Sequence, residues 1–144
     1  ILQAVTDLRD NSYCCRDAIL RGDLAAVGEC LNNYWKSKKT MAPQSEPKFV
    51  VEMRERLGDL ILGSSLAGAG GGGFFICLTK DADQLETIKQ RLATMPGVDD
   101  MQYMRAQINM NGLQVTIGDK CIGNPLVKSE WGVCLMVVLF DRSI

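Results

Sequence analysis

Histidine is absent from this chain of 144 residues, and its absence narrows the chemistry that the chain can perform. A Ser-His-Asp triad, a Cys-His pair and a metal site with an imidazole ligand are all excluded within these residues. Aromatic residues make up only 6% of the chain, which is too few for a surface that stacks nucleic-acid bases. The net charge is −1, so the chain also lacks the basic surface that a polyanion needs. We therefore expect no nucleic-acid partner.

Paired cysteine motifs and long apolar runs are missing as well. None of the six cysteines belongs to a Cys-x-x-Cys pair, and we interpret all six as reduced thiols of a cytoplasmic protein. The apolar run at residues 131–140 is too short to cross a bilayer, so we expect no membrane partner. That run fits either a buried strand or a tail that does not belong to the domain.

The first third of the chain predicts two consecutive helices. Apolar residues follow one helical face at intervals of three and four. These residues are Leu20, Leu24, Val27, Leu31 and Trp35. Gly22 interrupts the pattern, and Asp23 after it is a favourable N-cap for the second helix.

A third helix is expected after a linker at residues 41–45. Ser45 can cap this helix, and Pro47 suits its first turn. Its inward-facing residues would be Phe49, Val50, Met53 and Leu57.

After Gly58 the apolar residues no longer follow helical spacing, and the sequence predicts the strands of a sheet. Residues 60–66 and 74–79 are expected to form two strands around a glycine-rich loop. Asp81 with Gln84 resembles a capping box for a helix whose buried stripe would be Leu85, Ile88 and Leu92.

Alternating residues at 103–108 and 113–117 flank Asn111-Gly112, which predicts a hairpin. The order is helices followed by β-β-α-β-β. It predicts an α+β fold in two layers on a mostly antiparallel sheet.

Five of the eight residues from Gly68 to Phe75 are glycine. Such a run indicates positive φ angles, or the close approach of a phosphate or a second backbone. The dinucleotide fingerprint is excluded because a strand, not a helix, follows the loop, and no Lys-Ser/Thr pair completes a P-loop. Two explanations remain: a nest of N–H groups that binds an anion, or a tight β-connection that packs against a neighbouring domain.

Residues 66–74 read Leu-Ala-Gly-Ala-Gly-Gly-Gly-Gly-Phe and resemble the C-terminal glycine motif of the GHMP kinases. Residues 18–28 resemble the helical segment upstream of that motif, and Trp35-Lys36-x-Lys38-Lys39 resembles the Trp and lysines of the sugar-kinase branch. Followed by Leu78-Thr79-Lys80, the motif is most similar to L-fucokinases, with heptose 7-phosphate kinases next. The resemblance covers residues 1–118, and residues 119–144 are a tail of uncertain origin.

The resemblance implies a two-domain kinase whose C-terminal domain has a ferredoxin-like α+β core. The glycine motif would border the phosphate and the substrate through Gly68, Ala69, Gly70, Gly71, Gly72 and Gly73. The partners would be a sugar, ATP and the protein's own N-terminal domain, which would bind most of the ATP and Mg²⁺. The reaction would transfer the γ-phosphoryl group of ATP to a sugar, giving L-fucose 1-phosphate from L-fucose for GDP-fucose salvage.

One departure from a whole kinase is evident. The chain holds no second Gly/Ser-rich phosphate loop, and no catalytic or metal-binding carboxylate can be assigned. It also begins at Ile1, inside a helical register. We therefore expect these residues to be a fragment without kinase activity of its own, with exposed apolar surface that makes it associate.

The remaining polar residues have ordinary structural explanations. Lys36, Lys38 and Lys39 fit a solvated helix end better than a phosphate contact, and Trp35 fits the core. Serine hydroxyls in strands usually satisfy backbone groups rather than a ligand. Ser64 and Ser65 are such serines. Arg105 fits a surface position. The pairs Asp81/Asp83 and Asp99/Asp100 fit a helix start and a turn, and neither needs a catalytic or metal-binding role.

Two classes of function therefore stay open. The first is the C-terminal part of a sugar kinase, with L-fucose or a heptose 7-phosphate as acceptor. The second is a non-catalytic α+β binding module whose glycine loop contacts a partner domain or a small effector.

Overall fold

The computed structural model describes residues 2–68, 73–96, 101–106, 115–117, 120–122 and 135–140. Ten elements follow one another along these residues. They are α1 (Leu2–Arg21), α2 (Leu24–Met41), α3 (Lys48–Leu57), β1 (Ile61–Ala67), β2 (Gly73–Thr79), α4 (Leu85–Leu92), β3 (Gln102–Ala106), β4 (Val115–Ile117), β5 (Lys120–Ile122) and β6 (Leu135–Phe140). The predicted α+β class is confirmed. No helix in the described part of the chain is long and apolar enough to cross a bilayer.

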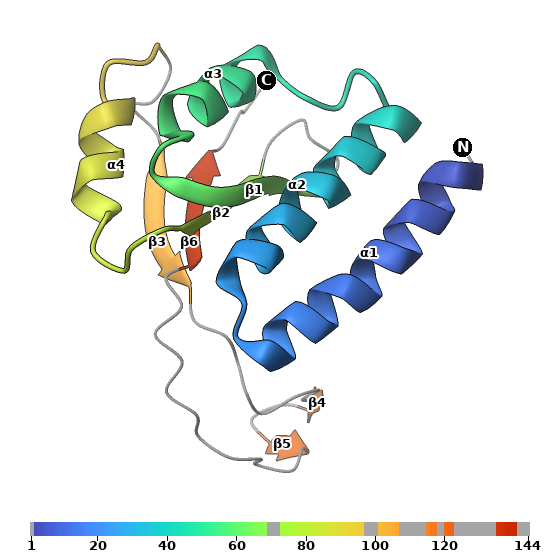
Figure 1. Ribbon diagram of the computed structural model, residues 1–144. Helices are drawn as coiled ribbons and strands as arrows, with labels where there is room; N and C mark the ends of the chain where they lie inside the picture. Colours follow the sequence, from blue (N-terminus) through green and yellow to red (C-terminus); the bar gives the residue numbers. More distant parts are fainter. Residues whose placement is uncertain are drawn as a thin grey trace.

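The helices α1 and α2 form an antiparallel pair, and α2 runs beside β1 (Figure 1). The predicted break between them is confirmed: Gly22 adopts φ 69°, and the Asp23 carboxylate accepts the Ala26 N–H at 3.0 Å as the N-cap of α2. The predicted stripe is wrong at Leu20, which is 76% exposed because the break places it on α1. Trp35 at the other end of the stripe is fully buried, as predicted.

Two predicted helix caps are wrong, because each helix begins a few residues later than the capping residue. The cap of α3 is Pro47, whose carbonyl accepts the Val50 N–H at 3.0 Å, while Ser45 lies upstream with a buried hydroxyl that has no partner. The cap of α4 is Gln84. Asp81 lies in the preceding turn, where its carboxylate accepts a hydrogen bond from the Gln84 side chain at 2.8 Å.

The main sheet has the order β1-β2-β6-β3, and every neighbouring pair is antiparallel. The predicted strand at residues 74–79 is confirmed as β2, which lies inside the sheet between β1 and β6. The predicted hairpin between residues 103–108 and 113–117 is wrong in its pairing, because β3 pairs with β6 and β4 pairs with β5 in a separate two-stranded sheet. Residues 107–114 of that hairpin lie outside the described part. The strand β6 falls within the apolar run at 131–140, and the division of the chain after residue 118 stays a prediction.

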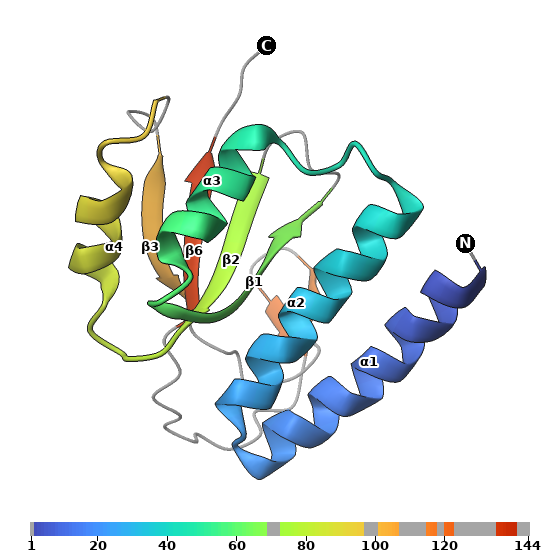
Figure 2. The ribbon, with the colours of Figure 1, turned by 45° about the horizontal axis from the view of Figure 1, so that its top comes forward.

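The hydrophobic core lies between one face of the sheet and the helices α2, α3 and α4, and Figure 2 shows α3 and α4 over that face. The predicted inward residues of α3 are confirmed, since Val50, Met53 and Leu57 are fully buried and Phe49 packs against them. The same holds for α4. Ile88 and Leu92 are fully buried, and Leu85 packs against the core.

The strand β3 turns Tyr103 toward the core and leaves Met104 40% exposed. The pairing register of the strands explains this orientation of the side chains. Tyr103 and Phe75 are both paired with Val138 of β6, so they share the face that the helices cover. Arg105 is exposed, as expected, and donates to the Ala82 carbonyl at 2.9 Å.

The backbone of α2 lies directly against the backbone of β1. A Cβ added to Gly63 would come within 1.9 Å of the Gly28 carbonyl oxygen, and one added to Gly28 would come within 2.6 Å of the Leu62 Cβ. Such an approach is possible only when both positions lack a side chain.

The outer edge of β1 is closed by Asn32 of α2. The Asn32 Oδ1 accepts the Ser64 N–H at 3.1 Å, and its Nδ2 donates to the Leu62 carbonyl at 3.4 Å. The side chain therefore takes the place of a further strand on an edge that would otherwise expose unpaired backbone groups.

We predict that Gly63→Ala destabilises the protein by about 3 kcal/mol or more, because the new methyl group meets backbone atoms that can yield only if α2 moves away from β1. Gly58→Ala is the matched control, since its Cβ would come no closer than 3.6 Å to another atom. Urea denaturation measures both. A Gly63→Ala variant within about 0.5 kcal/mol of the parent would contradict the packing described here.

A second prediction concerns the edge of β1. Asn32→Ala should cost about 1–3 kcal/mol, because it leaves the Ser64 N–H and the Leu62 carbonyl without their partner in a half-buried place. Asn33→Ala, one residue along on the exposed side of α2, should change the free energy of unfolding by no more than about 0.5 kcal/mol. Equal effects from the two substitutions would argue against the closing role of Asn32.

Candidate functional site at the glycine-rich loop

The glycine-rich loop leaves β1 and enters β2 through two glycines with positive φ. Gly68 has φ 84° and Gly73 has φ 122°, a region that residues with a side chain rarely adopt. A Cβ at Gly68 would meet nothing within 4 Å, so conformation and not space requires glycine there. The other proposed site residues, Ala69, Gly70, Gly71 and Gly72, lie outside the described residues, and their role stays a prediction.

Lys38 of α2 reaches the first residue of this loop. Its ammonium group donates a hydrogen bond to the Gly68 carbonyl. The same group lies 5.5 Å from the centre of the Trp35 ring and 5.7 Å from that of Tyr34, so two aromatic faces support the cation. A positive charge is thus placed where β1 passes into the loop.

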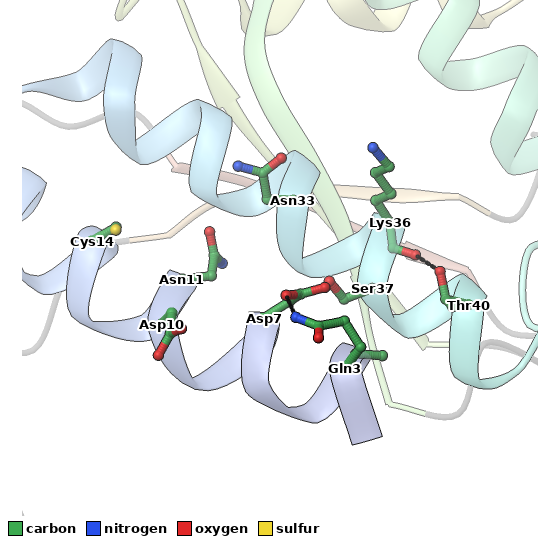
Figure 3. A pocket seen from close by; sticks show the side chains of 10 residues that line it. Gln3, Asp7, Asp10, Asn11, Cys14, Asn33, Lys36, Ser37 and Thr40 are labelled. Atoms are coloured by element: carbon green, nitrogen blue, oxygen red, sulfur yellow. Dashed lines mark hydrogen bonds between the residues drawn. The ribbon is translucent and has the colours of Figure 1, made fainter. Parts of the chain in front are cut away.

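The two neighbouring lysines lie elsewhere. Lys39 pairs with the Glu46 carboxylate at 2.8 Å, in the linker between α2 and α3. Lys36 is exposed and borders a polar groove of about 470 Å³ between α1 and α2, which Figure 3 shows with Asp7, Asp10 and Asn33 among the residues around it. The expectation of a solvated helix end fits Lys36, whereas Lys38 and Lys39 have defined partners.

The Glu46 carboxylate connects residues of α2 and α3 next to Lys38. Its carboxylate accepts hydrogen bonds from the Trp35 indole at 2.5 Å, from Lys39 at 2.8 Å and from Arg54 at 3.2 Å. Burial alone would raise the pKa of this carboxyl group, but the bonds from Lys39, Trp35 and Arg54 outweigh burial and lower the pKa below its ordinary value. Glu46 therefore stays ionised and fixes the indole on which Lys38 rests.

Arg54 extends this network to the sheet. Besides Glu46, its guanidinium donates to the Asn32 Oδ1 at 3.3 Å, the atom that also accepts the Ser64 N–H. Linker, α3, α2 and β1 are thereby connected by consecutive hydrogen bonds.

The two serines of β1 are buried rather than presented to a ligand. Ser64 is 1% exposed and has an unpartnered hydroxyl, and Ser65 is 4% exposed and donates to the Leu66 carbonyl at 3.4 Å. Within the described residues no group of three or more Cys, Asp or Glu side chains could hold a metal ion. The pair Asp99/Asp100 lies outside those residues.

Three residues of the site were missed by the sequence analysis: Asn32, Glu46 and Arg54. Each is polar, and a search for apolar periodicity passes over it. The available signal was spacing, because Gly28, Asn32, Trp35 and Lys39 recur at intervals of four, three and four and share one face of α2.

Comparison with known proteins identifies the family of this chain. The profile of the family described as "GHMP kinases C terminal" matches residues 15–97, which is more than half of the chain. The chain therefore belongs to the GHMP kinase family, and the matched part is the C-terminal domain of that family. The resemblance seen in the sequence is confirmed at this level.

Two curated relatives are named for the same sugar. The "Bifunctional fucokinase/GDP-fucose pyrophosphorylase" of Arabidopsis thaliana is 28% identical over 92 residues, which are 64% of this chain and 9% of that protein. The "L-fucokinase/L-fucose-1-P guanylyltransferase" of Bacteroides fragilis is 24% identical over 115 residues, 80% of this chain and 12% of that protein. The chain thus spans about a tenth of the length of these relatives. No solved structure gives a significant match.

The ionised state of Glu46 leads to a prediction on pH. Glu46→Gln keeps an acceptor for Trp35 but leaves Lys39 and Arg54 without their anion, so it should cost about 1–2 kcal/mol near pH 7. A carboxyl group with a lowered pKa stabilises the folded state above its unfolded pKa and loses that contribution as the pH falls through the folded value. The difference in the free energy of unfolding between parent and variant should therefore have its full size above pH 4.5, which is the ordinary pKa of a glutamate. It should become smaller as the pH falls below that value.

Denaturation curves recorded from pH 7 down to pH 3 measure this difference. Glu52→Gln is the control, because Glu52 makes a single, half-buried ion pair with Arg56 one turn further along α3 and should contribute no more than about 0.5 kcal/mol. A Glu46→Gln cost that is the same at pH 7 and pH 3 would contradict the assigned role of the carboxylate.

Proposed function

We propose that this chain is the C-terminal part of an ATP-dependent sugar kinase whose acceptor is L-fucose and whose product is L-fucose 1-phosphate. The observation that carries the proposal is the glycine-rich connection between β1 and β2 in a GHMP kinase domain whose two curated relatives are both named as fucokinases. The positive φ angles of Gly68 and Gly73, at the two ends of the loop, are consistent with this glycine-rich sequence.

In this proposal the loop from Gly68 to Gly73 borders the transferring phosphoryl group. Phosphoryl transfer needs positioning and stabilisation of charge more than covalent help from the protein. Backbone N–H groups of a glycine loop and the ammonium group of Lys38 supply both without a histidine or a catalytic carboxylate from this chain. The sugar hydroxyl attacks the γ-phosphorus and releases its proton to the solvent, the bond between the γ-phosphorus and the bridging oxygen breaks, and ADP leaves.

Among the residues described here, no group of three or more Cys, Asp or Glu side chains comes together that could hold a metal ion. ATP and Mg²⁺ would be held mainly by an N-terminal domain outside this chain, which is its partner within the same protein. A cytoplasmic location belongs to the same proposal.

The test is an assay of the full-length protein with ATP, Mg²⁺ and a panel of sugars that includes L-fucose and a heptose 7-phosphate. L-fucose 1-phosphate is the expected product, and the 144-residue chain alone should show no turnover. Turnover of the heptose 7-phosphate and not of L-fucose would make the heptose 7-phosphate the acceptor. No turnover with any sugar would favour a non-catalytic binding module.

Lys38 yields a sharper prediction for the same assay. Lys38→Met removes the charge at Gly68, and kcat/KM of the full-length protein should fall about 10- to 100-fold. Lys36→Met is the control, because Lys36 lies two residues away on the same helix and is exposed, and it should stay within about twofold of the parent. Equal activity of the Lys38→Met variant and the parent, with both folded, would remove Lys38 from the site.

A further inference from the structure

Cys15 of α1 and Cys30 of α2 face each other across the helix pair. The Asn11 side chain donates to the Cys30 carbonyl at 2.9 Å, so this turn of α1 lies against Cys30. Cys15 follows Asn11 by four residues and therefore lies on the same face of α1, one turn further on. Its side chain interacts directly with that of Cys30.

The surroundings of this pair leave one thiol accessible and the other protected. Cys30 is only 6% exposed, whereas Cys15 is half-buried. Both line an apolar cavity of about 600 Å³ between α1 and α2, together with Ile19 and Tyr34. A small oxidant can therefore reach Cys15 through the cavity more readily than it can reach the buried Cys30.

We propose that Cys15 and Cys30 form a dithiol site that hydrogen peroxide converts into a disulfide between α1 and α2. The site is separate from the glycine-rich loop and does not depend on the kinase assignment. Its consequence is structural: oxidation ties α1 covalently to the helix that carries Asn32 and Lys38.

The chemistry balances with peroxide as the only oxidant. The Cys15 thiol releases its proton, and the thiolate attacks one peroxide oxygen. The O–O bond breaks, the departing hydroxide takes up the released proton as water, and Cys15 becomes a sulfenic acid. The Cys30 sulfur then attacks the Cys15 sulfur, the S–O bond breaks, and the hydroxide that leaves takes up the Cys30 proton as a second water. Two thiols lose two electrons, and one peroxide gains them.

The order of the two steps follows from burial. Burial, reinforced by the neighbouring Cys15 and Cys14, raises the pKa of the Cys30 thiol. Since the thiolate is the reactive form, Cys30 is a poor first target and suits the role of the resolving thiol. Cys14 is adjacent to Cys15 but exposed, and the helical turn points it to a different side of α1.

The experiment maps thiols in the chain after brief treatment with hydrogen peroxide, alkylation with N-ethylmaleimide and digestion with trypsin. Cleavage places Cys14 and Cys15 in the peptide of residues 10–16 and Cys30 in that of residues 22–36, so the disulfide joins two identifiable peptides. The joined pair should form in the parent and in Cys14→Ser, and it should be absent from Cys15→Ser.

Thermal unfolding supplies a second measurement. Oxidation should raise the unfolding temperature of the parent and of Cys14→Ser, because the cross-link restricts the unfolded chain, and leave Cys15→Ser unchanged. Full alkylation of Cys30 in the peroxide-treated parent would overturn the proposal. So would a joined peptide pair that persists in Cys15→Ser, because Cys14 would then be the partner.

Discussion

The approach of α2 to β1 is the constraint on which the rest of the structure depends. Gly28 and Gly63 let the two backbones touch, and Asn32 then replaces a missing strand at the edge of the sheet. Because β1 leads directly into the glycine-rich loop, the seating of α2 also decides where the loop starts relative to the helix. Every residue of α2 that contributes to the candidate site is positioned by this contact.

A half-buried ionic network further along α2 stabilises that position as well. Glu46 is bonded to Trp35 and Lys39 on α2 and to Arg54 on α3, and Arg54 continues to Asn32. Removing one member of a buried network leaves its partners without compensation, which costs more than the net energy of a single bond. The network therefore couples the linker between α2 and α3 to the edge of β1.

The local features of this fold could be predicted from the sequence, and the non-local ones could not. Gly22-Asp23 encodes its own helix break, and the apolar run after Gly73 encodes a central strand. Asn111-Gly112 also gave a strong turn signal, yet β3 pairs with β6, far along the chain, because pairing is decided by the packing of whole strands. The polar contacts of Asn32, Glu46 and Arg54 depend on such tertiary neighbours. Helical spacing could have indicated Asn32 alone, and no pattern in the sequence indicated Glu46 or Arg54.

Helical geometry explains why one lysine of three reaches the loop. Successive residues of α2 are rotated by about 100°, so Lys38 and Lys39 fall three and four residues after Trp35 on its side of the helix, while Lys36 is turned away. Since Trp35 is fixed in the core by Glu46, the residue one turn later is carried toward the end of β1 and meets Gly68. Trp35, which the sequence assigned to the core, thus also orients the Lys38 ammonium group. One residue of α2 therefore serves both the core and the candidate site.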